Sequence, residues 1–230
     1  MFQKRLLVCF VSLVLLAGLA LASDGPTYLP PGQPDLIRLL PPPPSAVQSV
    51  AEINELLTLQ HSRTQDQAAF AREDAERSPL RFADVLGAGF RKDALPLTLT
   101  LFKHVLKDSN TVLDAAKKHW DRPRPFKLSE SLRPCLDRPV SASYPSGHST
   151  YGHLAAILLS WAVPEKAPEL FARGDLFARQ RLVGGVHYPS DVEAGKLCAV
   201  AIAQVMSQNP RFREEFAKAR IEIRTALGLP

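Results

Sequence analysis

The chain has 230 residues, of which 46% are hydrophobic and 22% are charged, and its formal net charge at pH 7 is +5. This composition is that of an ordinary globular protein with enough mass to bury a core. The mild positive charge is compatible with anionic substrates. Because no run of Lys and Arg is interleaved with aromatic residues, we expect no nucleic-acid partner.

Residues 1–22 carry the pattern of a secretory signal peptide. Lys4 and Arg5 precede an apolar run, which ends at the small residues of Ala20-Leu21-Ala22. A retained membrane anchor is the alternative, since the run is close to the shortest length that spans a bilayer. We expect cleavage, which lowers the formal charge to +3 by removing Lys4 and Arg5. The expected location is periplasmic or secreted, with no stable membrane insertion after cleavage.

Residues 23–45 are rich in proline and predict an extended arm. Proline at this density excludes a continuous helix. The segment also contains Leu36, Ile37, Leu39 and Leu40. We therefore expect the arm to pack on the domain that follows.

From residue 46 onward, apolar residues recur at helical spacing, as Val47, Val50, Ile53 and Leu56 illustrate. Further helices are predicted at 64–77, 80–88, 95–107, 110–120, 148–162, 166–182, 191–207 and 210–226. No segment between turn signals alternates with a period of two. The prediction is an all-α protein with a single helical-bundle domain at 46–230 behind the N-terminal arm.

Two segments place a Pro-Ser pair and a histidine at an expected helix start: "SYPSGHST" at 143–150 and "VHYPSDVE" at 186–193. In the second segment, Ser190 and Glu193 fit a capping box with Ser190 as N-cap. In the first, the backbone amides near Ser146 and Gly147 would point out of a helix start. Free amides and the positive end of the helix dipole together favour an anion.

Three cations complete the pattern: Lys117, Arg124 and Arg181. Each feature alone has an ordinary explanation as a solvated charge, a structural histidine or a helix-terminal acid. Together they would bind the oxygens of a tetrahedral anion. His187 has a carboxylate four residues later, in Asp191, that can hold one ring nitrogen and leave the other to attack. His148 can protonate the leaving oxygen, which gives phosphoryl transfer without a metal.

On these residues the chain resembles the acid phosphatases related to type 2 phosphatidic acid phosphatases and vanadium haloperoxidases. That family shares the blocks K-x(6)-R-P, P-S-G-H and S-R-x(5)-H-x(3)-D. Counting from Lys117 selects Arg124, not Arg122, and the second block is complete at 145–148. In the third block Gln180 replaces the leading serine, which leaves its role open. The signal and the proline-rich arm resemble the bacterial class A non-specific acid phosphatases.

The resemblance implies that His187 is the nucleophile of a phosphohistidine intermediate, that Asp191 orients it, and that His148 is the general acid. It implies phosphoryl binding by Lys117, Arg124, Ser146, Gly147 and Arg181. It further implies broad hydrolysis of small phosphate monoesters at acid pH, without a metal or another cofactor.

Three alternatives stay open: a vanadate-dependent haloperoxidase, a lipid-phosphate phosphatase, and a non-catalytic phosphate-binding protein. The sequence also leaves open the physiological ester, phosphotransfer to other alcohols, and assembly into a homo-oligomer. Cys135 and Cys198 can form a disulfide, or Cys198 can be a buried helical residue.

Overall fold

The computed structural model describes residues 25–230, so the predicted signal peptide at 1–22 lies outside the described residues. The described residues form helices and no strands, which confirms the predicted all-α class. The α-helices are α1 (Leu36–Leu39), α2 (Ser49–Ser62), α3 (Gln65–Glu73), α4 (Ala83–Leu86), α5 (Pro96–Trp120), α6 (Pro125–Leu128), α7 (Gly147–Ala162), α8 (Ala167–Val183), α9 (Pro189–Gln208) and α10 (Pro210–Ala226).

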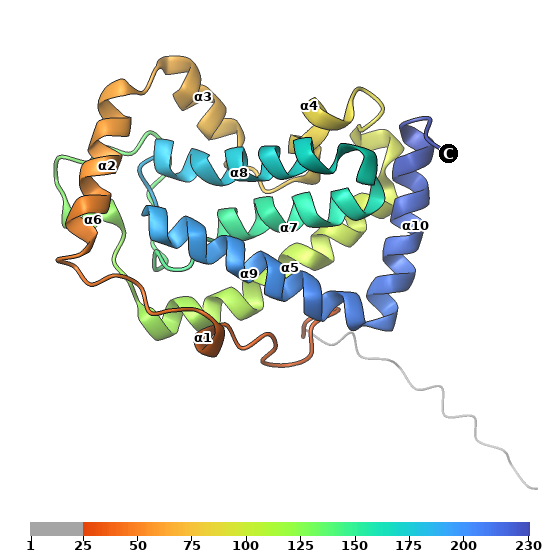
Figure 1. Cartoon of the computed structure of the whole chain (residues 1–230), viewed down its shortest axis with the longest axis horizontal. Coiled ribbons are helices and arrows are strands. Elements are labelled where there is room, and N and C mark those ends of the chain that lie inside the picture. The colour runs from red at the N-terminus through yellow and green to blue at the C-terminus, as the bar shows by residue number, and fades with distance from the viewer. Residues whose placement is uncertain (1–24) are drawn as a thin grey trace, which may run out of the picture.

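Helix α7 is the centre of the bundle. It packs mainly against α8 and α9, and Figure 1 shows it between these two helices, with α5 crossing nearby. Its sequence from Leu154 to Leu159 is apolar on nearly every side, which suits a helix surrounded by others. The start of α7 meets the start of α9 at Gly195, where an added Cβ would lie 2.7 Å from the Ser146 carbonyl oxygen. Only glycine fits this approach without a shift of one helix.

The prediction of two helices at 95–107 and 110–120 is wrong, because α5 is continuous. Asp108, Ser109 and Asn110 lie at the predicted gap, and such residues usually compete with the helical backbone. Here each polar side chain has another partner. Asp108 accepts from arm amides, Ser109 donates to the Leu106 carbonyl, and Asn110 accepts from Arg77.

The arm is attached to the domain through Asp108. This fully buried carboxylate accepts the amides of Thr27, Tyr28 and Leu29 at 2.7, 2.6 and 3.1 Å from its nearer oxygens. The backbone groups of an extended segment thus obtain partners that a helix or sheet would otherwise supply. The arm is therefore packed on the domain, as its apolar residues predicted.

Only two of the four apolar residues that were expected to pack the arm on the domain are buried. Leu36 and Leu40 are buried in the main core, whereas Ile37 and Leu39 are exposed. The reason is the short helix α1. Its turn places Leu36 and Leu40, which are four residues apart, on the side that faces the core, and it places Ile37 and Leu39 on the side that faces solvent. The arm is thus extended on either side of one helical turn.

The predicted helices at 64–77 and 80–88 differ most from the structure. Helix α3 ends at Glu73, and the predicted helix at 80–88 is a 3-10 turn at Pro79–Phe82 that runs into α4. Pro79 starts this turn, and Gly87 ends α4 with a positive φ of 96°. Helices α7, α8 and α9 match their predicted ranges to within two residues and α10 matches fully, whereas the one-turn helix α6 was not predicted.

No helix within residues 25–230 combines the length and apolar character that a bilayer span requires. The two cysteines in this part of the chain are free thiols. Cys198 is buried in α9, as one of the two expectations for it stated, and Cys135 is half-buried in the loop before α7.

Candidate active site

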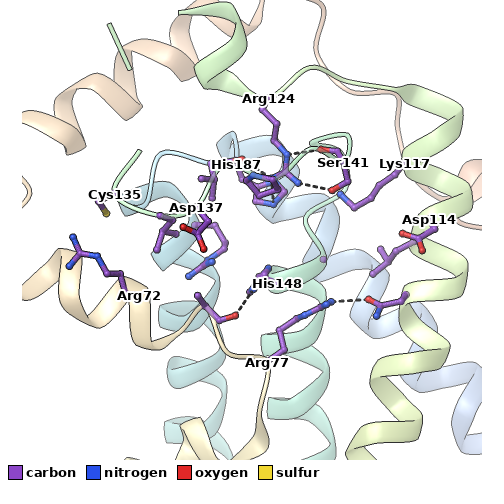
Figure 2. Close-up of a pocket in the computed structure, with 18 residues that line it drawn as sticks. Arg72, Arg77, Asp114, Lys117, Arg124, Cys135, Asp137, Ser141, His148 and His187 are labelled. Atoms are coloured by element: carbon purple, nitrogen blue, oxygen red, sulfur yellow. Dashed lines mark hydrogen bonds between the residues drawn. The ribbon is translucent and has the colours of Figure 1, made fainter. Parts of the chain in front are cut away.

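A cavity of about 480 Å³ lies where the start of α7 meets α5 and the loop before α9 (Figure 2). Six of the eight residues predicted for the site line it: Lys117, Arg124, Gly147, His148, Arg181 and His187. Asp191 and Ser146 are fully buried behind its wall. Residues from four separate helices and two loops therefore meet at one place.

The nucleophile candidate His187 lies in the loop immediately before α9 and is 3% exposed. Its Nδ1 lies 3.1 Å from Oδ2 of Asp191, and its Nε2 lies 2.9 Å from a terminal nitrogen of Arg124. Arginine can only donate hydrogen bonds, so Nε2 accepts and the ring proton is on Nδ1. The ring is held in the tautomer whose free lone pair is on Nε2.

Asp191 receives four hydrogen bonds in a fully buried position. The donors are Arg122 at 2.7 Å, the Tyr188 amide at 3.0 Å, His187 at 3.1 Å and the Ser143 hydroxyl. Burial alone would raise the pKa of this carboxyl, but the bond from His187 and the charge of Arg122 lower it to about 2. The carboxylate is thus ionised and fixed against the imidazole.

Burial lowers the pKa of His187 to about 3, and the Arg124 charge adds to this effect against the opposing bond to Asp191. The ring is therefore neutral at any pH above about 3. A neutral imidazole is the form that can attack an electrophile.

The capping box predicted for Ser190 is wrong. Helix α9 begins at Pro189 with Tyr188 as N-cap, and the carboxylate that caps it belongs to Asp191, which accepts the Tyr188 amide. Proline suits the first helical position because it has no amide proton to leave unpaired. Ser190 instead donates its amide to Glu52 and accepts from Arg122.

Arg122 has no predicted role, because the motif spacing counted from Lys117 selects Arg124. It is 5% exposed and donates to Asp191 on one side and to Glu52 and Ser49 on the other, each at 2.7 Å. Its guanidinium also lies 3.8 Å from the ring centre of Tyr188. Arg122 therefore connects α2 to the pair formed by Asp191 and the nucleophile candidate. The repeated Arg-Pro in "RPRP" was its only sequence signal.

His148 lies in the first turn of α7 and is half-buried. Its Nε2 lies 3.0 Å from the Ala75 carbonyl oxygen, which can only accept, so Nε2 carries a proton and Nδ1 is the atom that titrates. Burial lowers the pKa of His148 well below its usual value, and the charge of Arg181 adds to this effect. A bound anion would reverse part of this shift.

The three predicted cations are held by backbone carbonyls. Lys117 donates to Ala142 at 2.7 Å, Arg124 to Ser141 at 2.9 Å and to Val186 at 2.8 Å, and Arg181 to Ala71 at 2.8 Å. Burial lowers the pKa of Lys117 to about 7, with the charge of Arg124 contributing. Burial also lowers the pKa of both Arg124 and Arg181 to about 10.

Arg181 shows a shortage of acceptors at this site. Its Nε is buried and has no hydrogen-bond partner among the described residues. A buried donor without an acceptor costs about 1–3 kcal/mol. An anion in the cavity would supply the acceptor that the protein does not.

The start of α7 carries the remaining predicted residues. Gly147 lines the cavity, whereas the Ser146 side chain accepts the Ser149 amide at 3.3 Å and its own amide donates to the Asp191 carbonyl at 3.0 Å. Phosphoryl binding by the Ser146 hydroxyl stays a prediction. Gln180 is buried in α8 and is not part of the cavity lining.

The cavity also contains residues with no motif signal. Arg77, which follows α3, and Asn110 of α5 form a 2.8 Å hydrogen bond on its wall. The chain distance between these residues and their position outside the three blocks hid them from sequence reasoning. Within residues 25–230, no cluster of three or more His, Cys, Asp or Glu has a metal-binding arrangement.

The profile of the PAP2 superfamily matches residues 97–215. The non-specific acid phosphatase of Salmonella typhimurium is 32% identical over 96% of this chain and 93% of its own length. The acid phosphatase of Zymomonas mobilis is 31% identical over 83% of this chain and 76% of its own length.

Two solved structures share the fold at 18% identity. A bacterial vanadium-dependent iodoperoxidase superposes with a TM-score of 0.58 over 74% of this chain and 52% of its own. A transmembrane PAP2-type phosphatidylglycerolphosphate phosphatase from Bacillus subtilis superposes with a TM-score of 0.51 over 71% and 86%. At this identity they establish the shared helical fold.

Proposed function

The chain belongs to the PAP2 superfamily, as one of its non-specific acid phosphatases, and from this premise we propose that it hydrolyses phosphate monoesters through a phosphohistidine on His187. The observation that carries the proposal is that His187 and His148 line one cavity with the three predicted cations. Anion binding alone needs no buried imidazole–carboxylate pair, so the site favours an enzyme over a phosphate-binding protein.

In the first step Nε2 of His187 attacks phosphorus and a P–N bond forms as the ester P–O bond breaks. The attack places positive charge on the imidazole, which ionised Asp191 stabilises through the proton on Nδ1. The hydrogen bond from Arg124 to Nε2 must break, and the freed N–H can bind a phosphoryl oxygen instead.

Protonated His148 supplies the proton that the departing alkoxide takes. The same residue, now neutral, removes a proton from water, whose oxygen attacks phosphorus. The P–N bond breaks, inorganic phosphate leaves and His187 returns to its neutral form. One imidazole thus acts as acid and then as base, as microscopic reversibility requires.

The cations provide the electrostatic part of catalysis. Lys117, Arg124 and Arg181 are anchored on carbonyls before substrate arrives, so they need little reorganisation during the reaction. Arginine binds two oxygens with its planar fork, which lysine cannot do. The chemistry proposed uses these side chains and no metal ion.

Export is a separate part of the proposal. The leader pattern at residues 1–22 supports a periplasmic or secreted enzyme acting on small phosphate esters. N-terminal sequencing of the protein recovered from outside the cytoplasm tests this, with a mature start near residue 23 as the expected result.

Trapping of the phosphoenzyme tests the mechanism directly. A radiolabelled monoester is mixed with the enzyme and quenched in alkali, because phosphohistidine survives base and hydrolyses in acid. We expect label on wild type and on the control His119→Ala, an exposed histidine at the end of α5, with or without EDTA. His187→Ala should carry none. Label on His187→Ala, or label that is lost in base, would overturn the proposal.

A further inference from the structure

Arg77 is a cation of the cavity that the proposed mechanism does not use. Its guanidinium is half-buried, and its only hydrogen bond to a described residue goes from one terminal nitrogen to the neutral side chain of Asn110. Arginine has five N–H donors, so most of those on Arg77 are free. No carboxylate among the described residues lies within 4.0 Å of it.

The three phosphoryl-binding cations differ from Arg77 in this respect. Lys117, Arg124 and Arg181 each donate to backbone carbonyls, which fix their positions. Arg77 makes no such bond. Burial lowers the pKa of Arg77, and electrostatic interactions with Tyr151 and Asp114 oppose this effect only in part, so the half-buried charge beside the cavity is incompletely compensated. Asp114 lines the same wall but is exposed.

Arg77 lies on the leaving-group side of the cavity. Besides burial and the Arg181 charge, the charge of Arg77 lowers the pKa of His148, so the guanidinium is close to that ring. One of its nitrogens lies 3.8 Å from the position that a Cβ on Gly147 would occupy. In Figure 2 Arg77 lies next to His148, at the end of the cavity opposite His187 and Arg124.

In an in-line reaction the leaving oxygen faces away from the attacking nitrogen and toward the general acid. The alcohol attached to that oxygen therefore extends past His148 toward Arg77. The cavity volume of about 480 Å³ leaves room for a small alcohol beside the phosphoryl group. None of the residues that line it is a Phe, Tyr or Trp, so a base or another ring would meet no large aromatic side chain there.

We infer that Arg77 forms a subsite for a carboxylate on the leaving alcohol, so that the preferred substrates are phosphorylated hydroxy acids. The free fork of Arg77 matches the two oxygens of a carboxylate, and pairing would neutralise its charge. The inference rests on the proposed function, because the proposed in-line reaction sets the direction in which the ester lies in the cavity.

Binding of phosphonates tests the subsite without requiring turnover. Phosphonoacetate, 3-phosphonopropionate and 4-phosphonobutyrate are titrated by calorimetry beside their uncharged carboxamides. In wild type, at least one of the three phosphonates should bind about tenfold more tightly than its own carboxamide. Such a ratio is typical of a charge-assisted hydrogen bond. Arg77→Gln should bring that ratio close to one. Arg77→Lys should retain part of the preference, which separates charge loss from unfolding.

Arg72→Gln is the matched control. Arg72 lines the same cavity but is exposed, so its loss should change the ratio less than about twofold because solvent screens the charge. Equal binding of carboxylate and amide in wild type would overturn the inference. The inference would also be overturned if Arg77→Gln weakened the binding of inorganic phosphate as much as the binding of the carboxylate phosphonates. Arg77 would then be a ligand of the phosphoryl group.

Parallel hydrolysis assays separate the two proposals. Turnover of phosphoglycolate and its amide at equal kcat/KM, with no carboxylate preference in binding, would refute the subsite and leave the phosphatase intact. A carboxylate preference in binding with no hydrolysis of any ester would refute the phosphatase and leave the subsite.

Discussion

Arg124 donates a 2.9 Å hydrogen bond to Nε2 of His187, the atom that attacks phosphorus in the proposed mechanism. The same guanidinium is anchored to the Ser141 and Val186 carbonyls. The attacking nitrogen thus accepts a hydrogen bond from a residue that would also bind the phosphoryl group. A phosphoryl oxygen competes with the imidazole for the Arg124 donor, so substrate binding itself exposes the lone pair.

Replacing Arg124 should move the acid limb of the pH profile. Next to burial, the Arg124 charge is the largest cause that lowers the pKa of His187 to about 3. In Arg124→Gln this pKa rises, so the neutral form is lost at higher pH and the limb shifts upward. In Arg124→Lys the charge remains and the limb should stay. Both variants should lower kcat/KM by about 10²–10³-fold.

Rates on p-nitrophenyl phosphate between about pH 2.5 and pH 7 check this pair. Plotting kcat/KM is essential because it reports the free enzyme. Identical acid limbs in Arg124→Gln and Arg124→Lys would show that the guanidinium does not act on His187 through its charge.

Phosphate should raise the pKa of His148. Burial and the Arg181 charge lower this pKa, so without an anion His148 takes up its proton only at a more acidic pH than an ordinary histidine does. A bound dianion offsets the cations. The basic limb of kcat should therefore lie at higher pH than that of kcat/KM.

Imidazole NMR checks the His148 titration with and without saturating inorganic phosphate. The expected result is an upward shift for His148, and a smaller shift in Arg181→Gln, where the free-state pKa starts higher. An unchanged His148 titration on phosphate binding would contradict its place beside the phosphoryl group.

Loss of Arg122 should impair stability and turnover together. In Arg122→Met, Asp191 and Glu52 lose their shared cation, and breaking such a buried pair costs about 3–5 kcal/mol. The orientation of His187 loosens with Asp191. Thermal unfolding and kcat on p-nitrophenyl phosphate are the measurements.

Arg138→Met is the matched control. Arg138 also lies over an aromatic ring, that of Phe126 at 5.6 Å, but it is exposed and has no ion pair within 4.0 Å among the described residues. It should change the melting temperature little. If Arg138→Met lowered the melting temperature and kcat as much as Arg122→Met, the buried ion pairs of Arg122 would have no special role.

The sequence predicted the parts of this site that depend on local spacing. His187 and Asp191 are four residues apart at a helix start, and this spacing alone brings Nδ1 to the carboxylate. The helices at 148–162 and 210–226 were predictable because their apolar pattern is long and regular. His148 and His187 share a cavity because α7 and α9 begin side by side, which the three blocks anticipated through the family resemblance.

The remainder depends on contacts between distant segments. Asp108 lies in the gap between two predicted helices, yet it is inside α5 and its carboxylate accepts amides about 80 residues earlier in the chain. Arg77 meets Asn110 only after α3 and α5 have folded against the same cavity. Arg122 resembled a redundant copy of Arg124, and its partner Glu52 lies in another helix. No spacing rule encodes such pairs.

Gly195→Ala should separate the two histidines. The added Cβ would lie 2.7 Å from the Ser146 carbonyl oxygen and 2.7 Å from Cβ of Ser149, and neither atom belongs to the end of a flexible side chain. Helix α9 must therefore move away from α7, which costs about 1–3 kcal/mol. The hydrogen bond from the Ser146 amide to the Asp191 carbonyl, 3.0 Å long, would lengthen with it.

Because His148 is on α7 and His187 precedes α9, this movement changes the distance between acid and nucleophile. We expect kcat to fall by about 10²-fold, since a displacement of roughly 1 Å suffices for such a loss. Gly25→Ala is the control, as no atom of the described residues lies within 4 Å of its added Cβ. The readouts are the melting temperature and kcat on p-nitrophenyl phosphate. Unchanged kcat and stability in Gly195→Ala would mean that the close contact of the two helix starts does not position the site.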